Sequence, residues 1–317
     1  MSTFAFPNSI AISRTDSIGD VIVTLPLCGF IKKYSPNTRI TFIGRTYTQA
    51  IVEACPFVDD FVNFDKRENV ELKVDACVFA FPDLEVMKWV KEQGVKKRIA
   101  TGSRIASWKF ANDRIFFSRK NSDLHESQLN FYLLYPFGVK EIPSLEEIRA
   151  WHVLKPQVEN PIQLKPNKRS VVFHMLSKGS ALNWSLEEYQ KLASLLPASE
   201  FNIYITGTED EGVRIRDHFQ FDEHIVDVCG KLSLPQLIAF ISSCDTLVAA
   251  STGPLHIASA LGIQAIGLYP SKRPMHPGRW MPLGRNATYL EDGNTEQKES
   301  LEISPEAVLK KILAINS

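Results

Sequence analysis

The 317-residue chain has no excess charge of either sign, because 36 Lys and Arg residues balance 36 Asp and Glu residues. A neutral chain produces no global field that would attract nucleic acid, so no nucleic-acid partner is expected. The five cysteines are odd in number and form neither a CxxC pair nor a Cys/His metal-ligand spacing. The sequence therefore indicates a reducing environment, expected to be the cytoplasm, and no metal site.

Long apolar runs are also absent. The longest, residues 21–30, is interrupted and too short to span a bilayer. Residues 1–14 lack the charged segment and the apolar segment of a secretory signal. We therefore expect a chain that is neither secreted nor integral to a membrane.

The order of apolar runs and turn residues predicts an α/β fold. Short apolar runs at 9–13, 39–44, 61–64 and 76–79, and again at 170–175, 201–206, 246–250 and 264–269, alternate with helical patterns. That alternation is typical of a parallel doubly wound sheet. Between residues 151 and 169, Pro156, Pro161 and Pro166 interrupt the pattern and indicate a linker. Two domains are expected, 1–155 and 156–317.

The most informative stretch is 245–269, which predicts a strand, a tight loop, a helix and a second strand. Pro254 suits the first helical turn and Gly262 the C-terminal cap. The unpaired N–H groups of such a helix start favour an anion, and Thr252 and His256 lie on one face of its first turn. The alternative is an ordinary crossover in which Thr252 only caps the helix.

A similar unit opens the chain. The strand at 9–13 is followed by a loop containing Gly19 and Asp20, and then by the helical pattern 21–34. The helix dipole stabilises a carboxylate in a first turn, so Asp20 has a structural explanation as well as a functional one. Pro26 predicts either a kink or a later helix start.

Residues 88–120 contain ten Lys or Arg residues against Glu92 and Asp113. Such a run attracts anionic ligands, although a solvated basic face is in general the more common explanation. Trp108 and Phe110 lie among these cations, which by itself is weak support for nucleic-acid binding.

Several motifs together resemble glycosyltransferase family 9, the ADP-heptose:lipopolysaccharide heptosyltransferases. They are the stretch 14–26 (RTDSIGDVIVTLP), the turn 56–59 (PFVD), the segment 230–234 (GKLSL), and 251–262 (STGPLHIASALG). Two positions depart from the family pattern: Ser251 replaces the usual Asp, and Leu182 the usual Lys or Arg.

The resemblance implies a GT-B fold, in which two Rossmann-like doubly wound domains face a central cleft. It implies an N-terminal acceptor domain and a C-terminal nucleotide-sugar domain, with a last helix (304–315) that could pack back on the first domain. It further implies inverting transfer of a sugar, heptose above all, from ADP-heptose to a lipopolysaccharide core or related acceptor. Asp20 would be the base. The donor would be held by Ser177, Lys178, Glu209, Leu232, Ser251, Thr252, Gly253 and His256, and the acceptor by Gly19, Arg104, Lys109, Arg119 and Lys120.

No cofactor is implied. No Asp-x-Asp pair, the usual anchor for a diphosphate-bound cation, occurs in the sequence, so metal-independent transfer is expected. The expected partners are the nucleotide-sugar donor and an anionic glycolipid or glycan, with a possible peripheral contact at the inner membrane surface. Two alternatives stay open: a sugar-nucleotide epimerase of the same fold, and a catalytically degenerate sugar-nucleotide-binding protein.

Overall fold

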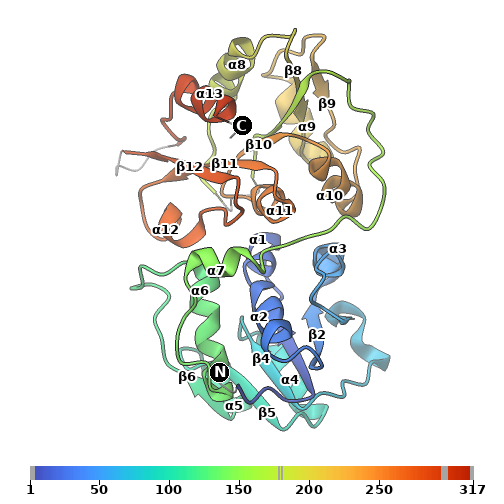
Figure 1. Ribbon diagram of the computed structural model, residues 1–317, viewed down its shortest axis with the longest axis vertical. Helices are drawn as coiled ribbons and strands as arrows, with labels where there is room; N and C mark the ends of the chain where they lie inside the picture. The colour runs from blue at the N-terminus through green and yellow to red at the C-terminus, as the bar shows by residue number, and fades with distance from the viewer. Residues whose placement is uncertain (1–3, 178, 180, 294–298, 315–317) are drawn as a thin grey trace. The chain divides into compact units, whose positions relative to one another are not determined.

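A computed structural model describes residues 4–177, 179, 181–293 and 299–314. The chain separates into two compact units, Met1–Lys155 and Pro156–Ser317 (Figure 1). Among the described residues, no helix has the length and apolar content needed to cross a bilayer. The five cysteines are buried free thiols.

Within its described part, the first unit contains one six-stranded sheet in the order β3-β2-β1-β4-β5-β6, with every pair parallel. The strands are β1 (Ser9–Ser13), β2 (Arg39–Gly44), β3 (Asp60–Asn63), β4 (Ala76–Phe79), β5 (Lys97–Thr101) and β6 (Asp113–Ile115). The helices are α1 (Ile18–Ile22), α2 (Pro26–Tyr34), α3 (Gln49–Glu53), α4 (Leu84–Glu92), α5 (Ile105–Phe110), α6 (Glu126–Phe131) and α7 (Leu145–Arg149). Short 3₁₀ segments are η1 (Thr46–Thr48), η2 (Phe64–Asn69) and η3 (Tyr132–Phe137).

The described part of the second unit repeats this topology, with a parallel sheet in the order β12-β11-β10-β7-β8-β9. Its strands are β7 (Arg169–His174), β8 (Phe201–Ile205), β9 (Ile225–Asp227), β10 (Thr246–Ala250), β11 (Gln264–Pro270) and β12 (Ala287–Asp292). Its helices are α8 (Leu186–Leu195), α9 (Glu209–Arg216), α10 (Leu234–Ser242), α11 (Gly253–Leu261), α12 (Pro277–Trp280) and α13 (Pro305–Leu313).

Side-chain alternation builds a layer on each face of both sheets. In β7, Val171 and Phe173 belong to a core shared with α8, α9 and α13, so the buried Val172 between them faces the other side. On one face of the first sheet, α4 supplies part of a similar core. Elsewhere in this unit, aromatic rings of α2 and α6 pack against Trp151. Gly29 makes this packing possible, because a Cβ there would lie 2.5 Å from the Trp151 Cβ.

The structure confirms the predicted doubly wound α/β class and most of the predicted elements, with β1, β4 and β10 at the expected bounds. Pro26 marks a later start rather than a kink: α1 ends at Ile22, and α2 begins with Pro26 in its first turn. Val308 and Ile312 of the last helix, α13, are buried in the core of the second unit. These contacts make α13 an integral helix of the second unit.

Candidate active site

The strand order of each sheet predicts the position of a ligand crevice before any side chain is considered. In each sheet, the chain first adds strands on one side of its first strand and then returns to add strands on the other side. Ligands of doubly wound sheets bind outside the carboxyl ends of the strands at this switch point. The switch lies between β1 and β4 in the first unit, and between β7 and β10 in the second.

Arg14 follows β1 directly and organises the crevice of the first unit. Its side chain is 4% exposed and pairs with three carboxylates: Asp20, Asp16 (Nε to Oδ1, 2.6 Å) and Glu126 (Nη1 to Oε1, 3.3 Å). Burial opposes the charge, but the three carboxylates together raise the pKa of Arg14 above its ordinary value. The guanidinium therefore stays charged and holds Asp16 and Asp20 in place.

Asp20 lies in the first turn of α1 and is not its cap. Ser17 is the N-cap residue, and its Oγ donates a hydrogen bond to Asp20 Oδ2 at 2.5 Å. The Asp20 carboxylate is 18% exposed, so it is oriented by Arg14 and Ser17 yet still reachable by a ligand. Its neighbour Asp16 is the other candidate base in this loop. Burial raises the pKa of Asp16, with Arg14 opposing the shift.

Of the expected acceptor residues, Gly19, Arg104 and Arg119 lie near Asp20. Gly19 is buried beside it in α1. The Arg104 guanidinium lies 4.8 Å from the centroid of Phe81, and that of Arg14 lies 6.0 Å from the same ring, just beyond the end of β4. Arg119 pairs with Glu126 and donates to the Ala80 carbonyl at 3.0 Å.

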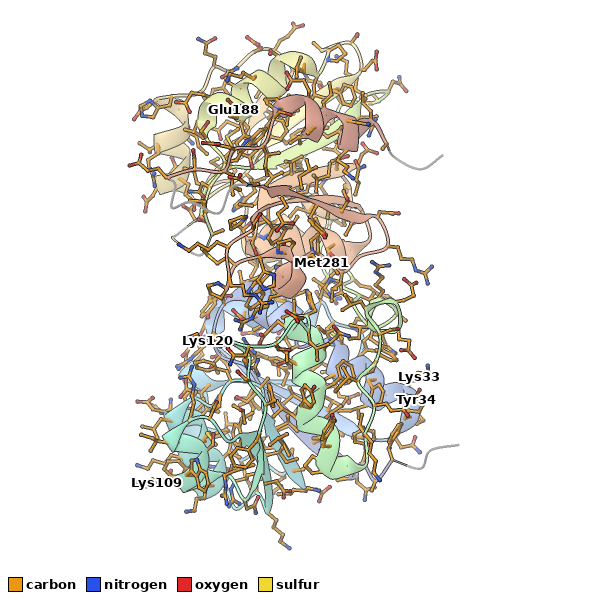
Figure 2. All side chains as sticks on the ribbon, turned by 90° about the vertical axis from the view of Figure 1, so that its left-hand side faces the viewer. Lys33, Tyr34, Lys109, Lys120, Glu188 and Met281 are labelled. Atoms are coloured by element: carbon orange, nitrogen blue, oxygen red, sulfur yellow. The ribbon has the colours of Figure 1, made fainter. Side chains whose placement is uncertain are left out.

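Lys120 and Lys109 occupy different parts of the first unit (Figure 2). Lys120 is exposed and follows Arg119 directly. Lys109 lies in the last turn of α5. The next residue, Phe110, accepts a hydrogen bond at its carbonyl from Arg98 Nε at 2.7 Å, and Arg98 lies near the start of β5. The strands are parallel, so Lys109 lies at the amino edge of the sheet, away from Asp20. The structure does not bring it to the crevice.

In the second unit, the carboxyl end of β10 leads directly into α11. Thr252 is the N-cap residue and is 5% exposed, yet among the described residues nothing hydrogen-bonds to its Oγ1. Gly253 opens the helix, and the buried His256 donates its N–H to the Thr252 carbonyl at 3.4 Å. A buried hydroxyl without a partner costs free energy unless a ligand or water supplies one. This helix start therefore has the features of an anion site.

The loop after β7 lies on the other side of the same switch point. Ser177 Oγ donates to the Ala181 carbonyl at 3.0 Å. Lys178, expected to contact the phosphate, lies outside the described residues. Ser251 immediately precedes Thr252 and is half-buried.

Glu209 and Leu232 lie at the carboxyl ends of β8 and β9. Glu209 opens α9 and pairs with Arg216 at 2.8 Å. Gly230 has a φ of 72°, and a Cβ on it would lie 2.1 Å from Glu209 Oε2. The glycine thus allows the two loops to approach closely and places the half-buried Leu232 beside the Glu209 loop.

Sequence reasoning missed three residues of these crevices. Arg14 and Glu126 form the buried ion-pair network behind Asp20. Arg14 could have been predicted as a site residue, because it is a cation directly after an apolar strand. Glu126 is far from Arg14 in the sequence, and no local pattern indicated that the two would pair. His174 ends β7, and its Nδ1 lies 3.1 Å from Thr206 Oγ1. Burial lowers the pKa of His174, so the ring is neutral at physiological pH.

Comparison with known proteins identifies similar chains. Residues 91–309 match the model of glycosyltransferase family 9 (heptosyltransferase). The chain is 22% identical to the lipopolysaccharide core heptosyltransferase OpsX of Haemophilus influenzae, over 92% of this chain and 87% of that one. Among solved structures, E. coli ADP-heptose LPS heptosyltransferase II has a TM-score of 0.78 at 17% identity, covering 97% and 98% of the two chains.

The E. coli heptosyltransferase WaaC with ADP-2-deoxy-2-fluoro heptose has a TM-score of 0.70 at 16% identity, over 96% of this chain and 99% of that one. At these identities, the likeness between the solved structures and this chain lies in the fold. That fold is GT-B, as expected from the sequence.

Proposed function

Because the chain belongs to glycosyltransferase family 9, we propose that it transfers a heptose from ADP-heptose to a lipopolysaccharide core or related glycan acceptor, with inversion at the anomeric carbon. Family membership confirms the resemblance predicted from the motifs and makes the chain a glycosyltransferase. The names of its relatives support the sugar and the acceptor class, and the ligand in the WaaC structure supports the nucleotide.

The observation that carries the donor assignment is the unsatisfied Thr252 hydroxyl at the start of α11. We infer that the donor diphosphate occupies this position, where Thr252 Oγ1 and the first N–H groups of α11 donate to it. Along the same edge, Glu209 follows β8, which is two strands from β10, and Gly230 and Leu232 follow β9, which is three strands from β10. The nucleoside end of a donor would require residues at such positions. The second unit is therefore the proposed donor domain.

The first unit is the proposed acceptor domain, with Asp20 as the general base. Asp20 removes the proton of the acceptor hydroxyl as its oxygen forms a bond to the anomeric carbon and the bond to the diphosphate breaks. The leaving nucleoside diphosphate takes up the negative charge at the start of α11. We propose that no divalent metal takes part, because the chain has no Asp-x-Asp pair.

An anionic acceptor suits the cations beside Asp20. Arg104 and Arg119 lie near the end of β4, and Lys120 follows them on the surface. Salt screens contacts with exposed charges, so the acceptor KM should rise with ionic strength more than the donor KM does. A neutral acceptor used equally well at high salt would count against this acceptor class.

Turnover of a panel of donors tests the proposal. Purified protein is incubated with ADP-heptose, and with GDP- and UDP-sugars, in the presence and absence of a lipid A core acceptor, and nucleoside diphosphate release is measured. Release from ADP-heptose that requires acceptor is expected. Conversion of the donor without acceptor would identify an epimerase, and tight binding without turnover would identify a binding protein.

The donor site has its own test. Thr252→Val removes the hydroxyl but keeps the shape, so ADP should bind roughly tenfold more weakly, the loss expected of one charge-assisted hydrogen bond. Thr288→Val on the edge strand β12 is the matched control, because β12 lies two strands from β10. Equal ADP affinity in both variants would remove the diphosphate from this helix start.

A further inference from the structure

The first unit displays an unusual apolar surface. Among the large hydrophobic side chains of the described residues, the three most exposed are Ile105 at 88%, Phe116 at 69% and Trp108 at 59%. All three come from one stretch, residues 105–116, which contains α5 and β6. Isolated exposed hydrophobic residues are common, but neighbouring ones mark an interaction surface.

The two rings are held in place by the backbone. Trp108 Nε1 donates to the Gly102 carbonyl at 3.0 Å, and the Trp108 and Phe116 centroids lie 6.0 Å apart. Gly102 makes room for Phe116, because a Cβ there would lie 2.4 Å from that ring. The Gly102 N–H also donates to the Ile115 carbonyl at 2.8 Å. The rings and the exposed Ile105 therefore make an ordered platform.

Cations lie on and beside this stretch of the chain. Residues 101–122 contain five cations and one acid, Asp113, whose carboxylate lies 4.0 Å from Lys97 Nζ. The Arg114 guanidinium lies 4.7 Å from the Trp108 ring, and Lys109 extends from the surface of α5 (Figure 2). The chain as a whole is neutral, so this positive charge is local.

We propose that Ile105, Trp108 and Phe116, with Arg114 and Lys109, dock the first unit onto an anionic lipid bilayer. Trp, Phe and aliphatic side chains partition into the boundary between headgroups and acyl chains, while Lys and Arg bind anionic headgroups. A second copy of the chain is a poorer occupant, because a symmetric contact would bring two positive patches together.

The Ile105 end of the patch adjoins the proposed acceptor site, since Arg104 precedes Ile105 and lies over Phe81, whereas Lys109 marks the end of the patch at the amino edge of the sheet. A bilayer-bound enzyme would meet a membrane-borne acceptor at this side. The link between bilayer docking and the acceptor rests on the proposed function, whereas the proposal that this surface binds lipid does not.

Vesicle flotation tests the docking surface without donor or acceptor. The full chain is mixed with phosphatidylcholine vesicles that contain or lack phosphatidylglycerol. Binding is expected only to the anionic vesicles, falling at least tenfold in the double variant Ile105→Ser/Trp108→Ser and severalfold in Lys109→Gln/Arg114→Gln. Leu313→Ser is the matched control, because Leu313 is 54% exposed but lies on α13 of the second unit. It should bind as the parent does.

Brominated lipid provides a second readout. It should quench part of the tryptophan fluorescence of the parent, and that part should be missing in Trp108→Phe. The proposal is overturned if the parent ignores anionic vesicles, or if Ile105→Ser/Trp108→Ser binds them as the parent does. It is also overturned if the patch variants abolish a dimer of the parent, which would make a second copy the occupant.

Discussion

Replacing Asp20 by Asn separates a catalytic role from a structural one. The amide keeps the size of the side chain and one acceptor oxygen but loses the charge that pairs with Arg14. Arg14 keeps Asp16 at 2.6 Å and Glu126 at 3.3 Å, so its buried guanidinium is still compensated. Because the amide keeps an acceptor oxygen and Arg14 keeps two carboxylates, we expect a stability loss of only about 1 kcal/mol.

The effect on turnover should be much larger. A general base contributes a factor of roughly 10² to 10⁴ in rate, which corresponds to about 3 to 5 kcal/mol of activation free energy. Since proton removal occurs only in the transition state, the nucleotide Kd should stay unchanged. A purely structural Asp20 predicts the same small stability loss, but with kcat nearly intact.

The assay measures kcat, the nucleotide Kd and the thermal midpoint for Asp20→Asn beside Asp16→Asn. Asp16 is the matched control, because it pairs with the same Arg14 and lies in the same loop. A kcat within about threefold of the parent would refute the base assignment for Asp20. If Asp16→Asn alone lost activity on this scale, Asp16 would take over the role.

Three further predictions concern stability, pH and metal. Glu126→Gln should lower the free energy of unfolding by about 3 kcal/mol, because Arg14 and Arg119 lose a buried counter-charge; an unchanged urea midpoint would contradict this. Burial lowers the pKa of His174 in the folded state, so its contribution to stability should be complete above pH 6.5 and fade as the pH falls through the folded pKa. The unfolding free energy of His174→Asn should then depend less steeply on pH below 6.5, and equal slopes would contradict it. Transfer should survive EDTA, and activity lost to EDTA but restored by Mg²⁺ would show that a metal takes part.

Local sequence patterns were sufficient to predict an element whose own residues determine its structure. The apolar run of β10, the small residues after it and Gly262 at the helix end predicted the strand, loop and helix around Thr252. Burial on both faces makes the strands of a parallel sheet continuous apolar runs, which single-sequence patterns detect. The family motifs likewise identified the fold class and the glycosyltransferase family before any coordinates were considered.

Patterns failed where neighbours, rather than the segment itself, stabilise an element. β5 begins with Lys97 and Arg98, and β6 has three residues, so neither has enough apolar residues to stand out from the basic stretch. β12 is a partly exposed edge strand and was missed for the same reason. Hydrogen bonding and packing against an adjacent strand stabilise these strands, although their own apolar residues are too few to predict them.

The sequence by itself determined that the chain folds into doubly wound sheets, that a helix start after β10 suits an anion, and that Asp20 lies near the start of a helix. Only the tertiary structure decided which charges act together. It joined Arg14 to Glu126, more than one hundred positions away, and it put Lys109 at the opposite edge of the sheet from Asp20. The physical reason is that ion pairs depend on distances of a few ångströms across strands and helices, which spacing along the chain does not specify.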